Sequence, residues 1–240
     1  MNLFIANWKM NMTRGRARAY AAELAERIGD GLSGAELVIA PPYTDFDAVR
    51  DSRERWSIAG QNLSEHAAGA FTGEISSAML ADAGCRWVIV GHSERRMLFG
   101  EDGPLLARKL ARAREAGLVP IYCVGETAGE RAAGATDSTL ARQVETLADD
   151  PQDAPLVVAY EPVWAIGTGL AATPLDSASA AAHLRGLLSS RRDFRILYGG
   201  SVNAGNARDL LGRGGVDGFL VGGASLDAST FAAIARAGAA

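Results

Sequence analysis

Cysteine and histidine are scarce in this chain, which limits the disulfides and metal sites that it can form. It has only two cysteines, Cys85 and Cys123, too few for a disulfide framework and not arranged as a CxxC pair. We therefore expect a reducing, cytoplasmic compartment. The three histidines, His66, His92 and His183, show no spacing typical of metal ligands, so we predict no metal site.

Basic blocks and long apolar runs are also missing. The formal net charge is −4 and the lysines and arginines are scattered, which argues against nucleic acid as a partner. No apolar run approaches the roughly 18 residues that a membrane-spanning helix needs. The first residues lack the basic region, long apolar core and cleavage site of a signal peptide. We expect neither a nucleic-acid partner nor a membrane partner.

Hydrophobic residues make up 48% of the 240 residues, and they occur in short runs that alternate with longer amphipathic segments. Most of the short runs are nearly all apolar and not alternating, which is typical of parallel strands covered on both faces. The predicted strands are 3–8, 36–40, 57–61, 87–90, 119–124, 156–160, 195–198 and 217–221. The clearest helical patterns cover 14–28, 105–116, 138–148, 176–190 and 225–237, and Thr173-Pro174 predicts the start of the fourth.

Eight strand–helix units without a break in composition favour one α/β domain over residues 1–240, closed as a (β/α)8 TIM barrel with eight parallel strands. The alternative is a doubly wound open sheet. That fold normally has a glycine-rich turn after its first strand, and residues 6–11, Ala-Asn-Trp-Lys-Met-Asn, contain no glycine. In a barrel, functional residues lie at the carboxyl ends of the strands.

A carboxylate follows the sixth predicted strand. Glu161 is followed by Pro-Val-Trp-Ala-Ile-Gly-Thr-Gly-Leu at 162–170, a segment stiffened by proline at one end and freed by glycines at the other. We interpret 161–170 as an active-site flap. Its closure would remove water from Glu161 and make the carboxylate a stronger base.

Two cationic or titratable residues follow other strands. Lys9 follows the first strand, and His92 follows the fourth at a predicted helix start, where the helix dipole favours the neutral imidazole. A neutral imidazole can donate a hydrogen bond to a carbonyl oxygen and then transfer the proton. Taken singly, Lys9 fits an ordinary surface lysine and His92 a structural histidine.

Paired glycines end the last two strands, at 199–200 and 222–223. Without side chains, their N–H groups can approach an anion closely, and barrels often bind phosphate in these two loops. The alternative for each pair is a plain tight turn. Together with Lys9, His92 and Glu161, the glycines predict a cofactor-free enzyme that holds a phosphate, polarises a carbonyl and moves a proton on the neighbouring carbon.

Three motifs are highly specific: Asn-Trp-Lys-Met-Asn at 7–11, Gly-His-Ser-Glu-Arg-Arg at 91–96, and the run at 161–169. Further motifs lie at 59–62, 69–74, 123–126, 198–202 and 218–226. With these motifs in order, the whole chain resembles the triosephosphate isomerase family. The resemblance implies a glycolytic and gluconeogenic isomerase that interconverts dihydroxyacetone phosphate and D-glyceraldehyde 3-phosphate through an enediolate, without a cofactor.

The resemblance also implies roles for single residues. Glu161 would be the base and His92 the neutral electrophile, while Asn7 and Lys9 would steady the enediolate oxygens and Glu94 would pair with Lys9. The residues whose N–H groups would bind phosphate are Gly167, Ser201, Gly222 and Gly223.

Other implied roles concern the flap and the partner subunit. The implied flap residues include Pro162, Trp164, Ile166, Gly167 and Thr168; Tyr198 and Ser201 would receive the closed flap, and Glu126 would hold Trp164 in the open one. The loop 69–74, with Phe71 and Thr72, would enter a neighbouring subunit, which implies a homodimer. The family usually has lysine where this chain has Leu170, so the flap's hinge departs from the pattern.

Two other functions remain open at this point. One is a sister isomerase that acts on a four-carbon erythrulose phosphate with the same catalytic residues. The other is a barrel that binds sugar phosphate without turnover. The intact set of Lys9, His92 and Glu161 argues against the second.

Overall fold

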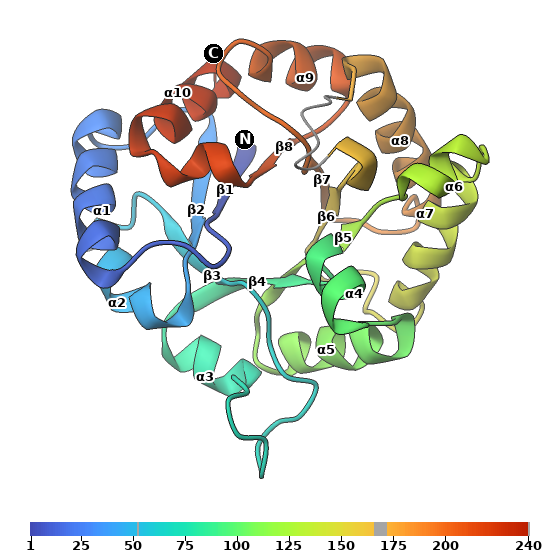
Figure 1. Ribbon diagram of the computed structural model, residues 1–240, viewed down its shortest axis with the longest axis horizontal. Helices are drawn as coiled ribbons and strands as arrows, with labels where there is room; N and C mark the ends of the chain where they lie inside the picture. The colour runs from blue at the N-terminus through green and yellow to red at the C-terminus, as the bar shows by residue number, and fades with distance from the viewer. Residues whose placement is uncertain (52, 166–171, 240) are drawn as a thin grey trace.

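The computed structural model describes residues 1–51, 53–165 and 172–239. Within them, eight parallel strands close into a barrel in chain order, and β1 pairs with β8 to complete it (Figure 1). The strands are β1 (Asn2–Asn7), β2 (Ala35–Ala40), β3 (Ser57–Gly60), β4 (Cys85–Val90), β5 (Val119–Val124), β6 (Leu156–Tyr160), β7 (Phe194–Tyr198) and β8 (Gly218–Val221). The predicted (β/α)8 barrel is confirmed, and the closed sheet excludes the doubly wound alternative.

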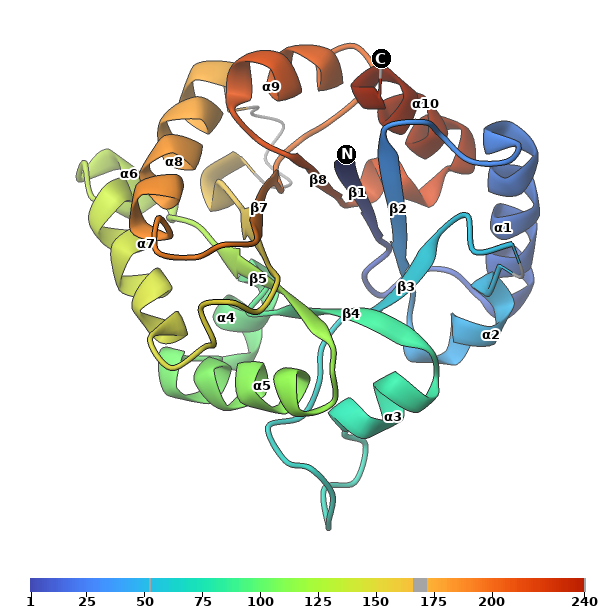
Figure 2. The same cartoon turned by 180° about the vertical axis from the view of Figure 1, so that it is seen from behind.

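The helices form a ring around the barrel, as Figures 1 and 2 show from opposite sides. They are α1 (Arg14–Ile28), α2 (Phe46–Val49), α3 (Ser77–Asp82), α4 (Ser93–Phe99), α5 (Gly103–Glu115), α6 (Ala128–Ala132), α7 (Thr136–Val144), α8 (Pro174–Leu187), α9 (Ala207–Gly214) and α10 (Ala228–Ala239). Short 3-10 turns lie at η1 (Tyr43–Asp45), η2 (Glu145–Leu147), η3 (Val163–Ala165) and η4 (Gly223–Leu226). No helix in the described part of the chain is long and apolar enough to cross a membrane.

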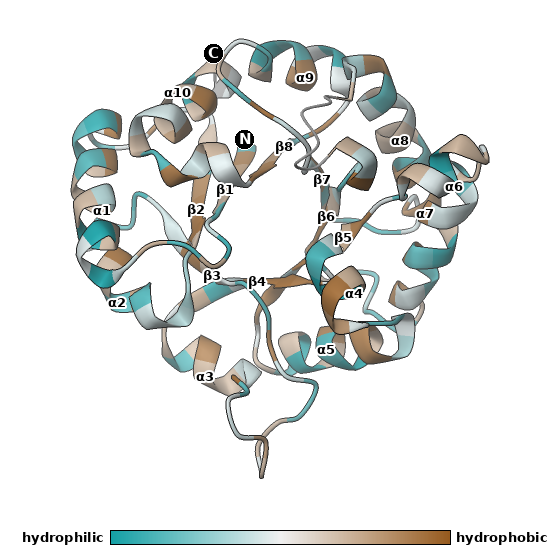
Figure 3. Cartoon of the chain, viewed as in Figure 1, coloured by the Kyte–Doolittle hydropathy of each residue, from teal (hydrophilic) through white to brown (hydrophobic). Residues whose placement is uncertain are grey.

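The strands are mostly apolar because both of their faces are buried. In β1, Leu3 and Ile5 belong to a cluster inside the barrel, while Phe4 and Ala6 belong to the larger cluster between strands and helices. Figure 3 shows the same layering, with hydrophobic strands inside a ring of helices whose residues vary in hydropathy. The pattern that predicted parallel strands therefore has a direct cause in this two-layer core.

Side-chain caps decide where the helices begin, and they move several predicted boundaries. Thr173 and Asp176 form a capping box before Pro174, so α8 starts where Thr173-Pro174 predicted. The prediction that the last helix begins at residue 225 was wrong. Asp227 accepts a hydrogen bond from the N–H of Thr230 at 2.8 Å, so α10 begins after it and residues 223–226 form η4.

One long loop leaves the barrel between β3 and α3. It projects beyond the ring of helices in both cartoon views (Figures 1 and 2). On this loop, the rings of Phe71 and His66 stack with their centroids 3.8 Å apart. Thr72 follows Phe71 and is exposed.

Candidate active site

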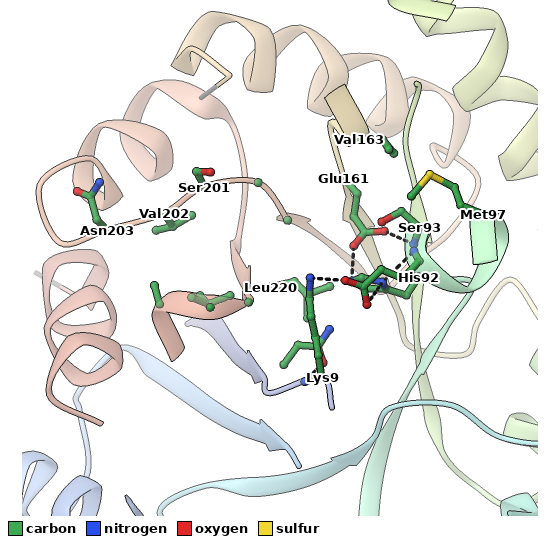
Figure 4. Close-up of a pocket in the computed structure, with 18 residues that line it drawn as sticks. Lys9, His92, Ser93, Met97, Glu161, Val163, Ser201, Val202, Asn203 and Leu220 are labelled. Atoms are coloured by element: carbon green, nitrogen blue, oxygen red, sulfur yellow. Dashed lines mark hydrogen bonds and ion pairs between the residues drawn. The ribbon is translucent and has the colours of Figure 1, made fainter. Parts of the chain in front are cut away.

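A cavity of about 530 Å³ lies at the carboxyl ends of the strands (Figure 4). Most of the residues predicted for catalysis and phosphate binding line it: Asn7, Lys9, His92, Glu94, Glu161, Ser201, Gly222 and Gly223. They are separated by up to 216 positions in the chain, and only the barrel brings them together. Three further predicted residues, Ile166, Gly167 and Thr168, lie outside the described residues, as does Leu170.

Glu161 is the most buried carboxylate in this cavity, with 2% of its surface exposed. It follows β6 directly, and its N–H donates to the carbonyl of Val124 at 2.7 Å. Its Oε2 accepts from the N–H of Ser93 at 2.8 Å, and its Oε1 lies 2.9 Å from Nε2 of His92. Burial raises the pKa of Glu161, but the contacts with His92 and Ser93 lower it by more, so this pKa lies below its ordinary value.

His92 is placed by the start of α4. As the N-cap residue, it accepts a hydrogen bond at Nδ1 from the N–H of Glu94 at 3.2 Å. That contact leaves Nε2 as the nitrogen that holds the proton facing Glu161. Burial lowers the pKa of His92, but the charge of Glu161, its hydrogen bond and the charge of Glu94 together raise it by more, so this pKa lies above its ordinary value. Burial favours the neutral form of His92, whereas the neighbouring carboxylates favour the charged form. The neutral form of His92 therefore stays a prediction.

Lys9 enters the cavity from an unusual backbone conformation, with a φ of 54°. Local hydrogen bonds hold it there: its N–H donates to Oδ1 of Asn7 at 3.2 Å, and its carbonyl accepts from Nε2 of Gln61 at 2.9 Å. Its Nζ forms an ion pair with Oε1 of Glu94 at 2.7 Å, as Figure 4 shows. A strained residue fixed by its neighbours at a cavity is typical of functional sites.

The opposite part of the cavity is built from backbone. Gly222 and Gly223 lie at the end of β8, where Gly223 opens the turn η4. A Cβ added to Gly223 would meet no atom within 4 Å, and one added to Gly222 would meet Lys9 only at an ordinary 3.5 Å. Packing therefore does not require glycine at these two positions. Their effect is to leave main chain open to the cavity beside the exposed Ser201, which suits an anion.

Comparison with known proteins gives this arrangement a family. The family model described as triosephosphate isomerase matches residues 2–238. The chain is 46% identical to the triosephosphate isomerase of Symbiobacterium thermophilum, over 98% of this chain and 95% of that protein. It is 48% identical to that of Nitratidesulfovibrio vulgaris strain DP4, over 97% and 98%. It is 45% identical to that of Halorhodospira halophila, over 99% and 98%.

The chain belongs to the triosephosphate isomerase family. This membership confirms the predicted family and the predicted aldose–ketose isomerase, and it favours neither alternative function. Among the described residues, no group of three or more His, Cys, Asp and Glu side chains could hold a metal ion.

In this triosephosphate isomerase family member, the residues predicted to secure the flap lie beside the cavity. Glu126 is fully buried, and its Oε1 accepts from Nε1 of Trp164 at 2.8 Å and from the hydroxyl of Tyr160 at 3.1 Å. Pro162 is buried between Glu161 and these contacts. Tyr198 is fully buried as well, and burial raises its pKa to about 12.

Three residues that the family motifs contain, but that the sequence reasoning gave no role, contact the site. Ser93 supplies the N–H that holds Glu161. Gln61 bridges the carbonyls of Lys9 and Ala40, each at 2.9 Å. Gly125 packs so closely on Glu161 that an added Cβ would lie 1.7 Å from its carbonyl oxygen. Their positions just after strands could have identified them as site residues, because the carboxyl ends of the strands in a barrel surround the active site.

Proposed function

We propose that this chain interconverts dihydroxyacetone phosphate and D-glyceraldehyde 3-phosphate through an enediolate, by proton transfer and without a cofactor. One observation carries the proposal: Glu161 is 2% exposed yet lines the cavity, with His92 Nε2 at 2.9 Å. A buried base and a proton donor that meet in one cavity suit a reaction that moves a proton between adjacent carbons.

Glu161 acts as the base. Its carboxylate takes a proton from C1 of dihydroxyacetone phosphate, and the electron pair of that C–H bond forms the C1–C2 double bond of the enediolate. The π electron pair of the C2 carbonyl moves onto O2, which takes a proton from His92, and the O1 hydroxyl proton returns to His92. Return of the carbon proton from Glu161 to C2, as C1 becomes the carbonyl carbon, completes the isomerisation. In the structure the carboxylate is hydrogen-bonded to Ser93 and His92, so it leaves these donors when it turns to the substrate carbon.

His92 and Lys9 handle the charge that develops on oxygen. The proton on Nε2 of His92 is donated toward the substrate's carbonyl oxygen, and the N–H of Glu94 holds the ring's other nitrogen. The ammonium of Lys9, with Asn7 beside it, stabilises the enediolate oxygens from the neighbouring wall of the cavity. Glu94 keeps Lys9 in place before substrate binds.

The substrate's phosphate is assigned to the backbone wall at Ser201, Gly222 and Gly223. In Figure 4, Ser201 lies on the other side of the cavity from Glu161. This separation would place a phosphate at one end of a short substrate and the reacting carbons at the other. We also assign Gly167 to this cradle and 161–170 to a flap that closes on Tyr198 and Ser201, with the Glu126–Trp164 contact holding the open form.

A coupled assay tests the proposal. Purified protein is given D-glyceraldehyde 3-phosphate and, separately, erythrulose phosphates, with Glu161→Gln as the matched inactive control. We expect turnover of the triose phosphate with a kcat/KM at least about tenfold above that for the four-carbon substrates, the range that one misfitting substrate group produces. A preference for the four-carbon substrates would identify the sister isomerase. Phosphate-inhibitor binding without any turnover would identify a binding protein.

We also propose a homodimer that uses the long loop after β3. Phe71 on this loop is 41% exposed, next to the exposed Thr72. Met97, Leu98 and Phe99 on α4 form a second exposed apolar surface, with exposures of 57%, 74% and 66%. Large apolar side chains in water favour burial in an interface. Light scattering should show a dimer, and Phe71→Asp combined with Thr72→Arg should give monomers of low activity.

The cytoplasm remains our proposed location for this enzyme. Cys85 and Cys123 are both free thiols and both buried. Burial raises the pKa of Cys85 to about 12, so its thiolate is scarce at neutral pH. Thiols of this kind suit a reducing compartment. Fractionation of cells that express the full chain at its natural level would place the protein directly.

A further inference from the structure

We infer that Gln143, on the helix α7, is a positioning residue for the base Glu161 and acts through the main chain of Gly125. This inference rests on the proposed function, because it concerns the same reaction. Gln143 is half-buried in the helix layer, outside the cavity where the chemistry takes place.

The side-chain amide of Gln143 makes two hydrogen bonds to one residue. The N–H of Gly125 donates to Oε1 of Gln143 at 2.7 Å, and Nε2 of Gln143 donates to the carbonyl of Gly125 at 3.0 Å. Gly125 follows β5, so these two bonds act as one more peptide pairing at the end of a barrel strand. They satisfy both polar groups of a residue that has left the β ladder.

Gly125 in turn bears directly on Glu161. A Cβ added to Gly125 would lie 1.7 Å from the carbonyl oxygen of Glu161, so the two backbones are packed without space between them. The residues on either side of Gly125 hold the same segment: the carbonyl of Val124 accepts from the N–H of Glu161 at 2.7 Å, and the carbonyl of Glu126 accepts from the N–H of Val163 at 3.2 Å. A shift of Gly125 would therefore shift the base.

Gln143 acts through these backbone contacts and not on the carboxylate itself. A second cavity of about 190 Å³ is lined by Gln143, Gly125 and Glu161 together with Arg96 and Cys123. Gln143 and Glu161 thus border the same space, but none of the contacts described for the carboxylate involves Gln143. The geometry thus assigns Gln143 to positioning and not to proton transfer.

The end of α7 is itself anchored to the strands. The carbonyl of Gln143 accepts from the hydroxyl of Tyr122 at 2.7 Å. Arg96 extends the network: its Nη2 donates to the Tyr122 hydroxyl at 3.1 Å and to the carbonyl of Cys123 at 2.9 Å, and its Nε donates to the carbonyl of Gly91 at 2.8 Å. Gly91 directly precedes His92. One network in the helix layer therefore fixes the strand ends that carry both the base and its partner.

The experiment compares Gln143→Met with the unmodified enzyme in the triose phosphate assay. Methionine keeps the length of the side chain but removes both hydrogen bonds to Gly125. We expect kcat to fall about tenfold or more, since small misplacements of a catalytic group can cost up to about a hundredfold. KM and the Kd of a phosphorylated inhibitor should change by less than about threefold, because the phosphate wall lies on β7 and β8, away from Gly125.

Asn2→Leu is the control for a merely structural effect. Nδ2 of Asn2 donates to the carbonyl of Gly238 at 2.7 Å, at the amino end of β1, where no cavity residue lies. This variant should lower Tm with normal kcat. Gln143→Glu keeps the acceptor for the Gly125 N–H but loses the donor. Its kcat should therefore lie between those of the unmodified enzyme and Gln143→Met. This variant replaces Gln143→Met in the test if Gln143→Met does not fold.

A normal kcat in both Gln143 variants would overturn the inference. So would a loss that appears in KM and inhibitor Kd, or one that Asn2→Leu reproduces at equal loss of Tm. Absence of triose phosphate turnover in the unmodified enzyme would instead overturn the proposed function, so the two failures are distinguishable.

Discussion

Two glutamates in this molecule are buried alike but held by different kinds of partner. Glu161 and Glu101 have 2% and 5% of their surface exposed. The Oε1 atom of Glu101 lies 2.5 Å from Nζ of Lys109 and 2.5 Å from Nε of Arg95. Glu161 is instead held by a backbone N–H, that of Ser93, and by a histidine.

The difference follows from what each carboxylate must do. The cations Arg95 and Lys109 compensate the charge of Glu101, and Glu101 in turn stabilises the charge of Lys109, whose pKa burial lowers. Such a carboxylate cannot leave its partners without exposing buried charges. Glu161 loses only two hydrogen bonds when it turns toward a substrate. The ion pairs of Glu101 therefore hold its carboxylate in place, while the carboxylate of the proposed base Glu161 remains able to move.

The largest effect is expected when the proposed base is removed. Glu161→Gln should lower kcat by at least ~10³, because an amide cannot take the proton and general-base catalysis contributes about 10²–10⁴. The amide oxygen can still accept from Ser93, so Tm and the Kd of a phosphorylated inhibitor should change little. Steady-state kinetics and calorimetry measure both. A kcat close to that of the unmodified enzyme would remove Glu161 from its assigned role.

Removing the charge of the other glutamate should damage stability and spare the chemistry. Glu101→Gln leaves Lys109 buried without its anion, and breaking a buried ion pair in this way costs about 3–5 kcal/mol of unfolding free energy. Denaturant unfolding gives this value, and kcat per folded molecule should stay within about twofold of normal.

The control for this variant is Glu23→Gln. Its surface pair with Arg27, at 2.7 Å, has side chains 43% and 42% exposed and should contribute less than about 1 kcal/mol. If Glu23→Gln and Glu101→Gln lost equal amounts of unfolding free energy, burial would not make the ion pairs of Glu101 more stabilising than the surface pair of Glu23.

The cation on the cavity wall offers a third point of comparison. Lys9→Ala should lower kcat/KM by about 10²–10³, through both kcat and KM, since removing one group that stabilises transition-state charge costs about that much. Stability should change by less than about 1 kcal/mol, because the ion pair of Lys9 with Glu94 is only partly buried. Lys9→Met keeps the aliphatic stem and should lose as much activity. Normal kinetics with reduced Tm would identify an ordinary surface lysine.

The smallest effect concerns an acidic residue outside both buried sites. Hydrogen bonds from the Ser229 hydroxyl, and from the N–H and hydroxyl of Thr230, lower the pKa of Asp227 to about 2. Because this pKa is lowered, the stabilisation is present above the unfolded value of about 3.9 and is lost as pH falls through about 2.

Asp227→Ala should therefore cost about 1 kcal/mol at neutral pH, and the difference from the unmodified protein should shrink between about pH 4 and pH 2. Asp227→Asn keeps a polar N-cap without a titrating group, so at neutral pH its stability should lie between those of Asp227→Ala and the unmodified protein. Thermal unfolding across this range provides the measurement. A constant difference between Asp227→Ala and the unmodified protein down to pH 2 would contradict the capping role.

The sequence was sufficient for much of the barrel. Short runs, most of them nearly all apolar, predicted all eight strands to within two residues, because both faces of each strand are buried. Boundaries were less certain where a side chain caps the backbone: Asp227 delayed α10, and Asp102, which accepts from the N–H of Leu105 at 3.0 Å, made α5 begin before residue 105. Capping depends on one contact, so it leaves only a weak pattern.

By itself, the sequence determined the fold class, the family and the residue types of the candidate site, since Lys9, His92, Glu161 and the paired glycines stand at strand ends that a barrel must gather. Only the tertiary structure decided which donors hold each carboxylate. Ser93 and Glu161 are 68 positions apart, and Gly125 and Gln143 are 18. Hydrogen bonds between residues so far apart in the chain depend on how the helices and strands pack in space. A local sequence pattern does not determine that packing.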